Sequence, residues 1–470
     1  MMSKPQRSEP KLFYHGISLD SRVPQDHSLR RIQQLVDFTF VRSQVEHLYG
    51  RNGQVSVDPT VLLKLIFLMF YENIKSERAL MAQLPLRLDW LWFCGYDLDD
   101  CTPDHSVLSK ARRRWGQKAF SEFFAVVLQQ CIDAGLVDGT TIHIDSSMID
   151  GNVSKDTLQP QLRLLGQNLY DDLETQSSEI PQDNTPLERR VSDTDPDARM
   201  RSKNGKSTLG YKDHRVVDDQ CGIITATLTT PADVNDEHQL QQAVQAHQNN
   251  THADLKTVVA DKAYGIIDNY RYLHDHGLTP CIPHKNPANA NEGLFGRDQF
   301  QYDADRDCYR CPAGQTLCRI RNNDEVETLI YSIDRTVCQA CEHLNRCVKS
   351  ETAGRTVNRK AGTEQIEWAD ACLSRSQRRR LMSRRRFKAE GSFADAANNH
   401  GFKRARWRGL VKMTIQNLMI AAIQNLRKLM RHRFRTTAKT SVATLKNTIS
   451  ERILHLFSSG MPIDPLPNQS

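Results

Sequence analysis

Three acidic residues carry the strongest indication of chemistry in this sequence. Asp261 follows a short apolar run at residues 257–260, and Asp145 follows a similar strand-like run at residues 141–144. An apolar run that stops at a carboxylate is typical of a buried parallel strand that delivers one acid to the rim of a sheet. Glu390 lies within an arginine-rich helical stretch. Three carboxylates beside positive charge could hold two divalent ions for phosphoryl transfer on a nucleic acid, because such ions activate a nucleophile and neutralise the transition state.

Each of these acids also has a plainer explanation when it is considered alone. An aspartate at the end of a strand is more often a helix N-cap or a turn former than a metal ligand. Glu390 lies four residues after Arg386, which could pair with it on one helical face. Asp150, Asp218 and Asp219 remain alternative carboxylates for a metal site.

Composition and length indicate a soluble protein of several domains. The chain has 470 residues, of which 39% are hydrophobic and 25% are charged, enough for roughly two to four domains with real cores. No secretory signal is visible at the N-terminus, so a cytoplasmic protein is expected. The longest apolar stretch, residues 61–71, contains Lys64 and is too short to span a bilayer. It is expected to be a buried helix, and no membrane partner is expected.

The pattern of apolar residues predicts helical ends around a mixed α/β sheet. Helices are expected to start at Asp58-Pro59, at Ser76 and after residues 102–106, because capping residues precede apolar periodicity there. Short strands alternate with helices after residue 136, which is typical of an α/β core. The expected segments are a helical DNA-binding or assembly domain (1–135), the first part of the core (136–290) with a polar loop (152–206), a cysteine-rich insertion (291–365), a basic helical region that completes the core (366–434) and a C-terminal tail (435–470).

Finer expectations concern the core and the end of the chain. A hairpin is expected to turn at residues 218–222, helices are expected over residues 237–248 and 267–276, and a last short strand is expected at residues 281–283. The basic region is expected to be broken at Gly391 and at His400-Gly401.

The cysteines indicate a metal site in the insertion. Six of the twelve lie between residues 308 and 347, and two C-x2-C pairs suit tetrahedral structural zinc. The predicted zinc ligands are Cys308, Cys311, Cys338 and Cys341. Cys318 and Cys347 lie close by and leave the ligand set ambiguous. The alternative is a small hairpin with reduced, packed cysteines.

Positive charge is concentrated in one part of the chain. Residues 375–412 contain thirteen Lys and Arg and two acids, a net +11, whereas the whole chain has +7. Such a concentration is the electrostatic footprint expected for a phosphate backbone, although charge runs are often only solvated faces. Trp407 could stack on a base or belong to a core. The residues predicted to contact DNA are Arg386, Lys388, Lys403, Arg404, Arg406, Trp407 and Arg408.

Taken together, these motifs resemble bacterial insertion-sequence transposases of the DDE class. The resemblance covers roughly residues 15 to 430. It rests on the two aspartate motifs (144–148 and 260–265), the glutamate motif (389–401), the segment 404–410, and the N-terminal features at 58–59 and 103–106.

This resemblance implies a ribonuclease-H-like catalytic core in which Asp145, Asp261 and Glu390 bind two Mg²⁺ ions, with Mn²⁺ as a substitute. It implies that water nicks the element ends and that the liberated hydroxyl attacks target DNA. The implied partners are double-stranded DNA, as terminal inverted repeats and target, and further copies of the chain in a dimer or larger assembly.

The chain departs from the family pattern near the glutamate. Many relatives carry Tyr, Arg and Lys there; Arg386 fits the arginine, but Ser383 and Ala397 stand at the other two positions. Lys388 or Lys403 could replace the missing lysine. Two alternative functions remain: a catalytically inactive or domesticated DNA-binding protein, and a metal-dependent nuclease without strand transfer.

Overall fold

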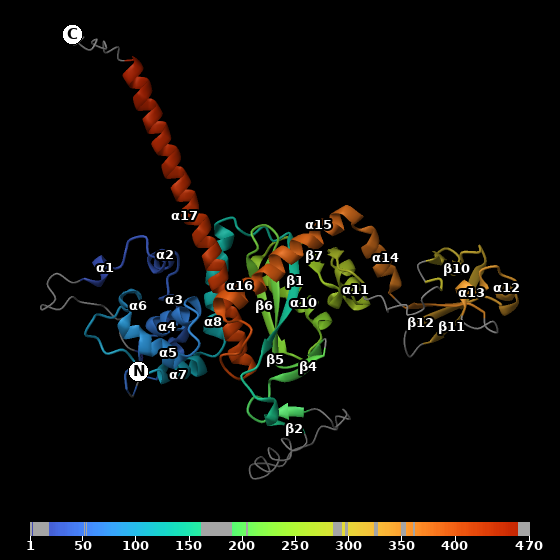
Figure 1. The fold of residues 1–470 in the computed structure, drawn as a ribbon, viewed down its shortest axis with the longest axis horizontal. Coiled ribbons are helices and arrows are strands. Elements are labelled where there is room, and N and C mark those ends of the chain that lie inside the picture. The colour runs from blue at the N-terminus through green and yellow to red at the C-terminus, as the bar shows by residue number, and fades with distance from the viewer. Residues whose placement is uncertain are drawn as a thin grey trace, which may run out of the picture.

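The computed structural model describes residues 2, 18–50, 52, 54–160, 190–203, 205–284, 294–296, 299–323, 328–348, 354–360 and 362–458. The protein is of mixed α/β type, with several sheets. In Figure 1 a helical part lies at one end, the largest sheet lies in the middle, and a smaller sheet lies at the other end. Within the described residues, no helix combines the length and apolarity needed to cross a membrane.

The N-terminal part is a cluster of short helices around a buried helix, α4. Asp58 caps α4 by accepting the Thr60 N–H at 2.9 Å, and Pro59 occupies its first turn. Ser76 caps α5 in the same way, so the predicted helix starts are confirmed. The elements are α1 (Leu19–Arg22), α2 (Ser28–Leu35), α3 (Phe40–Val45), η1 (Glu46–Leu48), α4 (Pro59–Tyr71), α5 (Glu77–Gln83), η2 (Leu84–Leu86), α6 (Leu88–Cys94), α7 (Ser106–Trp115) and α8 (Lys118–Asp133).

The central sheet has six strands. Its order is β4-β5-β1-β7-β8, with β6 also paired to β5. Strands β1, β7 and β8 are parallel, whereas β5 is antiparallel to β1, β4 and β6. The expected hairpin is present between β5 and β6. The strands are β1 (Thr141–Asp150), β4 (Arg199–Lys203), β5 (Lys206–Asp218), β6 (Ile224–Pro231), β7 (Thr257–Ala260) and β8 (Thr279–Cys281).

The prediction that a strand ends at Asp145 is wrong. Strand β1 continues to Asp150, because β5 pairs with it from Ile142 to Asp150. The parallel partner β7 stops earlier, at Ala260 opposite Ile144. Asp145 therefore lies in mid-strand, yet directly at the carboxyl edge of the parallel part of the sheet.

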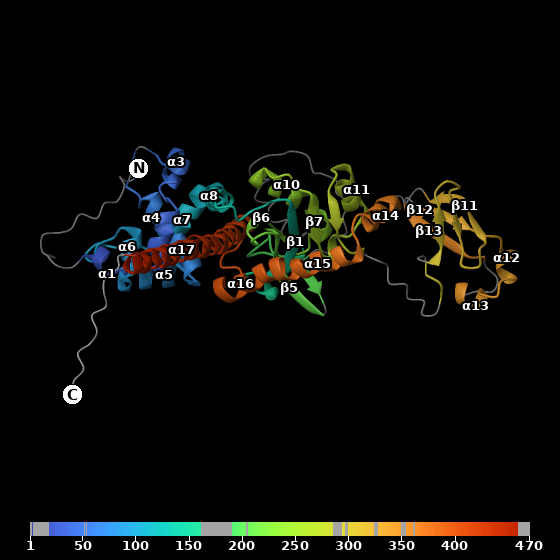
Figure 2. The same ribbon diagram turned by 90° about the horizontal axis from the view of Figure 1, so that it is seen from above.

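Helices from two parts of the chain pack around this sheet. The helices between β6 and β8 in the sequence are η4 (Asp236–Gln239), α10 (Leu240–Thr251), η5 (Lys262–Tyr264) and α11 (Ile267–Asp275). The helices near the end of the chain are α14 (Thr363–Ala371), α15 (Arg375–Arg385), the π-helical turn η8 (Arg386–Glu390), α16 (Gly391–His400) and α17 (Leu410–Ser458). Figure 2 shows α15 and α16 as one line beside the sheet, and η8 contacts β1 and β5.

Two breaks expected in the basic region have different outcomes. Gly391 does not interrupt the helix, since η8 passes directly into α16. Gly401 does end it, in a left-handed conformation with φ +61° that favours glycine. Beyond residue 434, α17 continues as a helix to Ser458.

Two smaller sheets complete the fold. The polar segment 152–206 is not simply a loop: its described ends form η3 (Lys155–Thr157), the pair β2 (Leu158–Pro160) and β3 (Arg190–Ser192), and β4. The cysteine-rich segment forms the sheet β13-β12-β11-β10-β9. Its elements are β9 (Gln301–Asp303), β10 (Cys308–Arg310), β11 (Thr316–Asn323), β12 (Thr328–Ser332), α12 (Arg335–Gln339), α13 (Leu344–Cys347) and β13 (Thr356–Lys360).

A fully buried arginine joins the central sheet to the helices that follow it. Arg215 on β5 donates to the Asp213 carboxylate at 2.7 Å, to Gln424 Oε1 of α17 at 2.8 Å and to the Ser392 carbonyl of α16 at 3.2 Å. Both partners of the ion pair are inaccessible to solvent. The Arg215 guanidinium also lies over the rings of Phe393 and Phe402. The side chain thus links three elements at one point.

Replacing Asp213 tests this link. We expect Asp213→Asn to lower the free energy of unfolding by about 3–5 kcal/mol, because it leaves the buried Arg215 charge without its counter-charge. The measurement is urea denaturation followed by tryptophan fluorescence. Asp254→Asn, which removes an exposed partner of Lys256, should change stability by less than about 0.5 kcal/mol. Equal effects of the two substitutions would contradict the structural role.

Candidate active site

Asp145 and Asp261 lie next to each other on neighbouring strands. In the parallel register of β1 and β7, Ile144 stands opposite Ala260, and each aspartate is the next residue. The carboxyl ends of parallel strands meet at one edge of a sheet, where ligand and catalytic sites of α/β proteins commonly lie. The two carboxylates are therefore brought to one place by strand pairing alone.

The residues around Asp261 have clear structural tasks. The Asp261 carboxylate accepts the Ala263 N–H at 2.7 Å and so caps the short helix η5. Tyr264 is buried, and its hydroxyl lies 3.4 Å from His214 Nδ1. Gly265 has no room for a side chain, because a Cβ would come within 2.3 Å of the Pro283 carbonyl oxygen. Asp261 is thus a helix cap and a neighbour of Asp145 at once.

Glu390 reaches the same edge from the helix across the sheet. It is the last residue of the π-helical turn η8, and its side chain is 52% exposed. π-helical turns are rare and are frequently found at functional sites. The turn packs on β1, which carries Asp145.

Arg385 connects Glu390 to Asp145. Its Nη1 lies 3.0 Å from Asp145 Oδ2, and its Nη2 donates to Glu390 Oε1 at 3.1 Å. The Arg385 side chain is only 9% exposed. A guanidinium between two carboxylates shows that this place attracts positive charge.

The pKa of Asp145 is raised to about 6. Burial of the carboxyl group is the main cause. Arg385 and the Ser146 N–H oppose this shift, whereas the negative charges of Asp261 and Glu390 add to it. The effect of Asp261 and Glu390 on the pKa of Asp145 is the electrostatic signature of carboxylates that lie near one another.

The three alternative acids have other roles. Asp218 accepts the Gly139 N–H at 2.8 Å and the Gln220 N–H at 2.9 Å, which fixes the turn after β5. Asp219 lies 2.7 Å from His143 Nε2 and accepts Arg384 Nε at 2.6 Å. Asp150 ends β1, and its backbone bonds to residues 403 and 405. The contacts of Asp218 and Asp219 are thus made by their carboxylates, whereas these contacts of Asp150 are made by its backbone.

The helical stretch α15–η8 carries two arginine triplets, residues 378–380 and 384–386, and each triplet divides between an inner and an outer face. Arg378 is ion-paired with Asp370 at 2.6 Å, Arg384 with Asp219 and Arg385 with Asp145. On the outer face, residues three to four positions apart form one exposed stripe that ends at the catalytic candidate glutamate. This outer stripe consists of Arg379, Arg380, Ser383, Arg386, Phe387 and Glu390.

The structure separates the seven residues predicted to contact DNA into two groups. Arg386 and Arg404 are exposed. Lys388 Nζ donates to the Gln220 carbonyl, and Arg408 Nε donates to the Asn152 carbonyl, while both side chains keep donors at the surface. Lys403 Nζ donates to Ser147 Oγ at 2.6 Å. Ser147 lies two residues after Asp145 on β1, so the two side chains are on the same face of the sheet.

Arg406 and Trp407, by contrast, are half-buried and make contacts within the protein. Arg406 donates to carbonyl oxygens of Met69 and Ile74 and to the Asn73 side chain, at the end of α4. Burial lowers the pKa of Arg406 to about 10. The Trp407 ring packs edge-on against Phe70 at 5.6 Å, and the Arg112 guanidinium covers its face at 3.8 Å.

Sequence reasoning missed two residues near the acids. Arg385 was not singled out, because Arg386 has the four-residue spacing to Glu390 that an α-helix would require, whereas the π turn brings Arg385 into contact. Phe387 is a large hydrophobic side chain that is 78% exposed on the outer stripe. An aromatic residue directly after a run of arginines is the sequence signal that could have identified Phe387 as a candidate contact.

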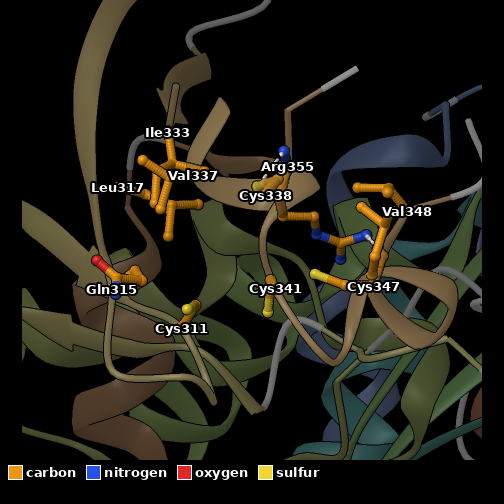
Figure 3. Close-up of a pocket in the computed structure, with 11 residues that line it drawn as sticks. Cys311, Gln315, Leu317, Ile333, Val337, Cys338, Cys341, Cys347, Val348 and Arg355 are labelled. Atoms are coloured by element: carbon orange, nitrogen blue, oxygen red, sulfur yellow. Dashed lines mark hydrogen bonds between the residues drawn. The ribbon is translucent and has the colours of Figure 1, made fainter. Parts of the chain in front are cut away.

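The cysteines group differently from the predicted set. Cys311, Cys338, Cys341 and Cys347 line one cavity in the small sheet region (Figure 3). Cys308 is not among the lining residues; it is buried in β10, opposite Cys318 of β11. Burial raises the pKa of Cys347, and the thiols of the other three cavity cysteines add to the shift, whereas Arg355 opposes it.

Metal binding would need side chains to move at both places. Within the part of the chain that the structure describes, no three His, Cys, Asp or Glu side chains stand close enough to hold an ion. At the acidic site the guanidinium of Arg385 already lies between two of the carboxylates. The donor set itself, three carboxylates at one sheet edge, suits Mg²⁺ or Mn²⁺.

Comparisons with known proteins place two family models on the chain. A transposase domain (DUF772) matches residues 17–114, and a transposase DDE domain matches residues 310–430. The second match includes Glu390, whereas Asp145 and Asp261 precede it. No curated protein matches the chain.

One solved structure with similarity is the cryo-EM structure of a piggyBac transposase synaptic complex with hairpin DNA. It is 11% identical with a TM-score of 0.31, and the alignment covers 93% of this chain and 84% of that chain. A similarity of this size does not establish a shared fold. The two family models, one over the N-terminal helices and one over the helix that carries Glu390, support a DNA transposase of the DDE class.

Proposed function

We propose that this transposase cuts the ends of its element and joins them to target DNA with Asp145, Asp261 and Glu390 as metal ligands. The observation that carries the proposal is the meeting of these three acids: two through strand register and the third through Arg385. Two Mg²⁺ ions, or Mn²⁺, would activate the attacking water or hydroxyl and neutralise charge on the phosphate.

The strand order of the central sheet supports a ribonuclease-H-like core. Three parallel strands (β1, β7 and β8) and three strands with antiparallel pairing (β4, β5 and β6) form one sheet, and the first aspartate stands on the inner strand β1. Asp145 and Asp261 would hold ions from the sheet edge, and Glu390 would close the site from η8. Arg385 would leave the carboxylates when an ion enters, because the two cations compete for the same oxygens.

DNA would approach along the outer stripe. Arg379, Arg380 and Arg386 form no ion pair with the described residues, and the stripe leads to Glu390. Phe387 offers a ring on which an unpaired base could stack. The helical segment 1–135 would bind DNA ends or hold copies of the chain together, since two ends must be joined at once.

Strand-transfer assays test the proposal. Labelled element ends and target DNA are incubated with the protein in Mg²⁺, beside Asp261→Asn and Glu390→Gln. We expect cut and joined products with the unmodified protein and a loss of more than about 100-fold in either variant, because each removes a ligand of the charge-stabilising ions. Lys256→Ala, at the opposite edge of β7, should retain activity.

Other outcomes distinguish the alternatives. Joined products that persist in Asp261→Asn would refute the triad. Cut products without joining would favour a nuclease. DNA binding without any cut in Mg²⁺ or Mn²⁺ would favour a DNA-binding regulator.

The raised pKa of Asp145 predicts a pH dependence of metal binding. Below a pKa of about 6 this carboxyl group is protonated in the folded protein, so an ion must displace a proton. We expect Mn²⁺ affinity, measured by calorimetry, to fall about tenfold per pH unit below pH 6 and to level off above it.

Arg385→Ala serves as the matched variant for this measurement. Arg385 lowers the pKa of Asp145, so its removal should move the transition to higher pH. It also removes a competing cation, so Mn²⁺ should bind about tenfold more tightly at pH 8. Affinity that is constant from pH 5 to pH 8 would exclude Asp145 as a ligand.

The outer stripe makes a separate prediction about salt. We expect the double variant Arg379→Ala, Arg380→Ala to reduce the slope of log affinity against log salt by about 0.9 for each DNA phosphate that the two arginines neutralise. Lys256→Ala removes a positive charge from the opposite edge of the sheet and should leave the slope unchanged. An unaltered slope in the double variant would place the DNA elsewhere.

A further inference from the structure

Four cysteines surround one cavity at the small five-stranded sheet. They come from three separate places: Cys311 follows β10, Cys338 and Cys341 lie in and after α12, and Cys347 ends α13. Figure 3 shows their side chains around the same space, with Arg355 beside them. Most other lining residues are apolar, namely Leu317, Ile333, Val337, Leu344 and Val348.

Backbone hydrogen bonds hold the first three cysteines in tight turns. The Cys311 N–H donates to the Gln315 carbonyl at 2.8 Å, and the Gly314 N–H donates back to the Cys311 carbonyl at 2.8 Å. Gly314 has φ +79°, which favours glycine at this turn. The Cys341 N–H donates to the Cys338 carbonyl at 3.1 Å, so this C-x2-C pair is a compact turn.

Arg355 supplies the surroundings that thiolate ligands require. Its backbone N–H donates to Cys338 Sγ at 3.4 Å, and its guanidinium donates to the Cys347 carbonyl at 2.7 Å. Four thiolates on one divalent ion leave two negative charges. A nearby guanidinium and an N–H···S bond offset part of that charge, as outer-shell partners of metal sites do.

The small sheet also has little core of its own. Its buried hydrophobic cluster consists of Phe300, Tyr309, Leu317, Tyr331 and Val357. A unit of this size with so few buried side chains usually needs a disulfide or a metal to be stable. The described cysteines are all free thiols.

We infer that Cys311, Cys338, Cys341 and Cys347 bind one structural Zn²⁺ ion that fastens α12 and α13 to the hairpin of β10 and β11. Rotation of the four side chains into the cavity would complete a tetrahedral site with no open position. Cys308 is excluded, because strand β10 directs it toward Cys318 and away from the cavity. The ligand set therefore combines one C-x2-C pair with two single cysteines.

Metal content of the full-length protein tests the assignment. We expect close to one zinc per chain by mass spectrometry, and a loss of at least about tenfold in Cys347→Ser and in Cys341→Ser, since three ligands hold a structural ion poorly. Cys308→Ser and Cys318→Ser are the matched controls and should keep their zinc. Zinc loss in Cys308→Ser with retention in Cys347→Ser would overturn the ligand set.

Alkylation of the unmodified protein provides a second measurement that does not depend on the folding of variants. Zinc should protect the four cavity cysteines from modification, and a chelator should expose them. The exposed thiols Cys101, Cys221 and Cys318 should react in both conditions. Absence of bound zinc, iron in its place, or equal reactivity of the cavity cysteines with and without chelator would refute the site.

Discussion

The buried charge of Arg215 is the constraint on which the arrangement of the active site depends. A guanidinium without solvent contact depends on the protein for its partners, and β5, α16 and α17 supply them to Nε and Nη1, whereas Nη2 is buried without a hydrogen bond. Arg215 stands opposite Asp145 in the strand register, and Ser392 lies two residues after Glu390. The contacts of one buried cation therefore help to hold the helical segment that carries Glu390 against the strands that carry Asp145 and Arg215. Strand pairing brings Asp145 to Asp261, and this helix contact brings Glu390 to the same edge.

The acidic site follows the same electrostatic logic at a smaller scale. Three acids at one sheet edge repel one another, and burial makes the charge of Asp145 still less favourable. Arg385 offsets part of this repulsion through its contacts with Asp145 and Glu390. In the proposed function, an entering cation would compete with Arg385 for the same carboxylate oxygens.

Much of the architecture could be predicted from the sequence, because it depends on local signals. Helix starts at Asp58 and Ser76 follow from capping, and the hairpin follows from its turn residues. Other features depend on partners that are distant in the chain. The sequence alone favours Arg406 and Trp407 as DNA contacts, whereas in the structure both side chains contact α4. Cys308 belongs to a C-x2-C pair, whereas Cys347 does not, so the sequence pattern favours Cys308 as a ligand. In the structure, however, Cys347 lines the cavity and Cys308 does not, because turn geometry and strand direction orient the thiols. Likewise, helical spacing selects Arg386 over Arg385, because a π turn is invisible to a rule based on 3.6 residues per turn.

The π turn at η8 has a consequence for how this segment can vary. A π turn takes up one residue more than an α turn within a single turn of helix, so the loss of one residue within 386–390 would let the helix continue as α while α15 and α16 kept nearly the same orientation. Arg385 and Glu390 would then stand four residues apart, a spacing that also places two side chains on one helical face. The extra residue of this turn could therefore be lost without separating the arginine face from the glutamate it contacts.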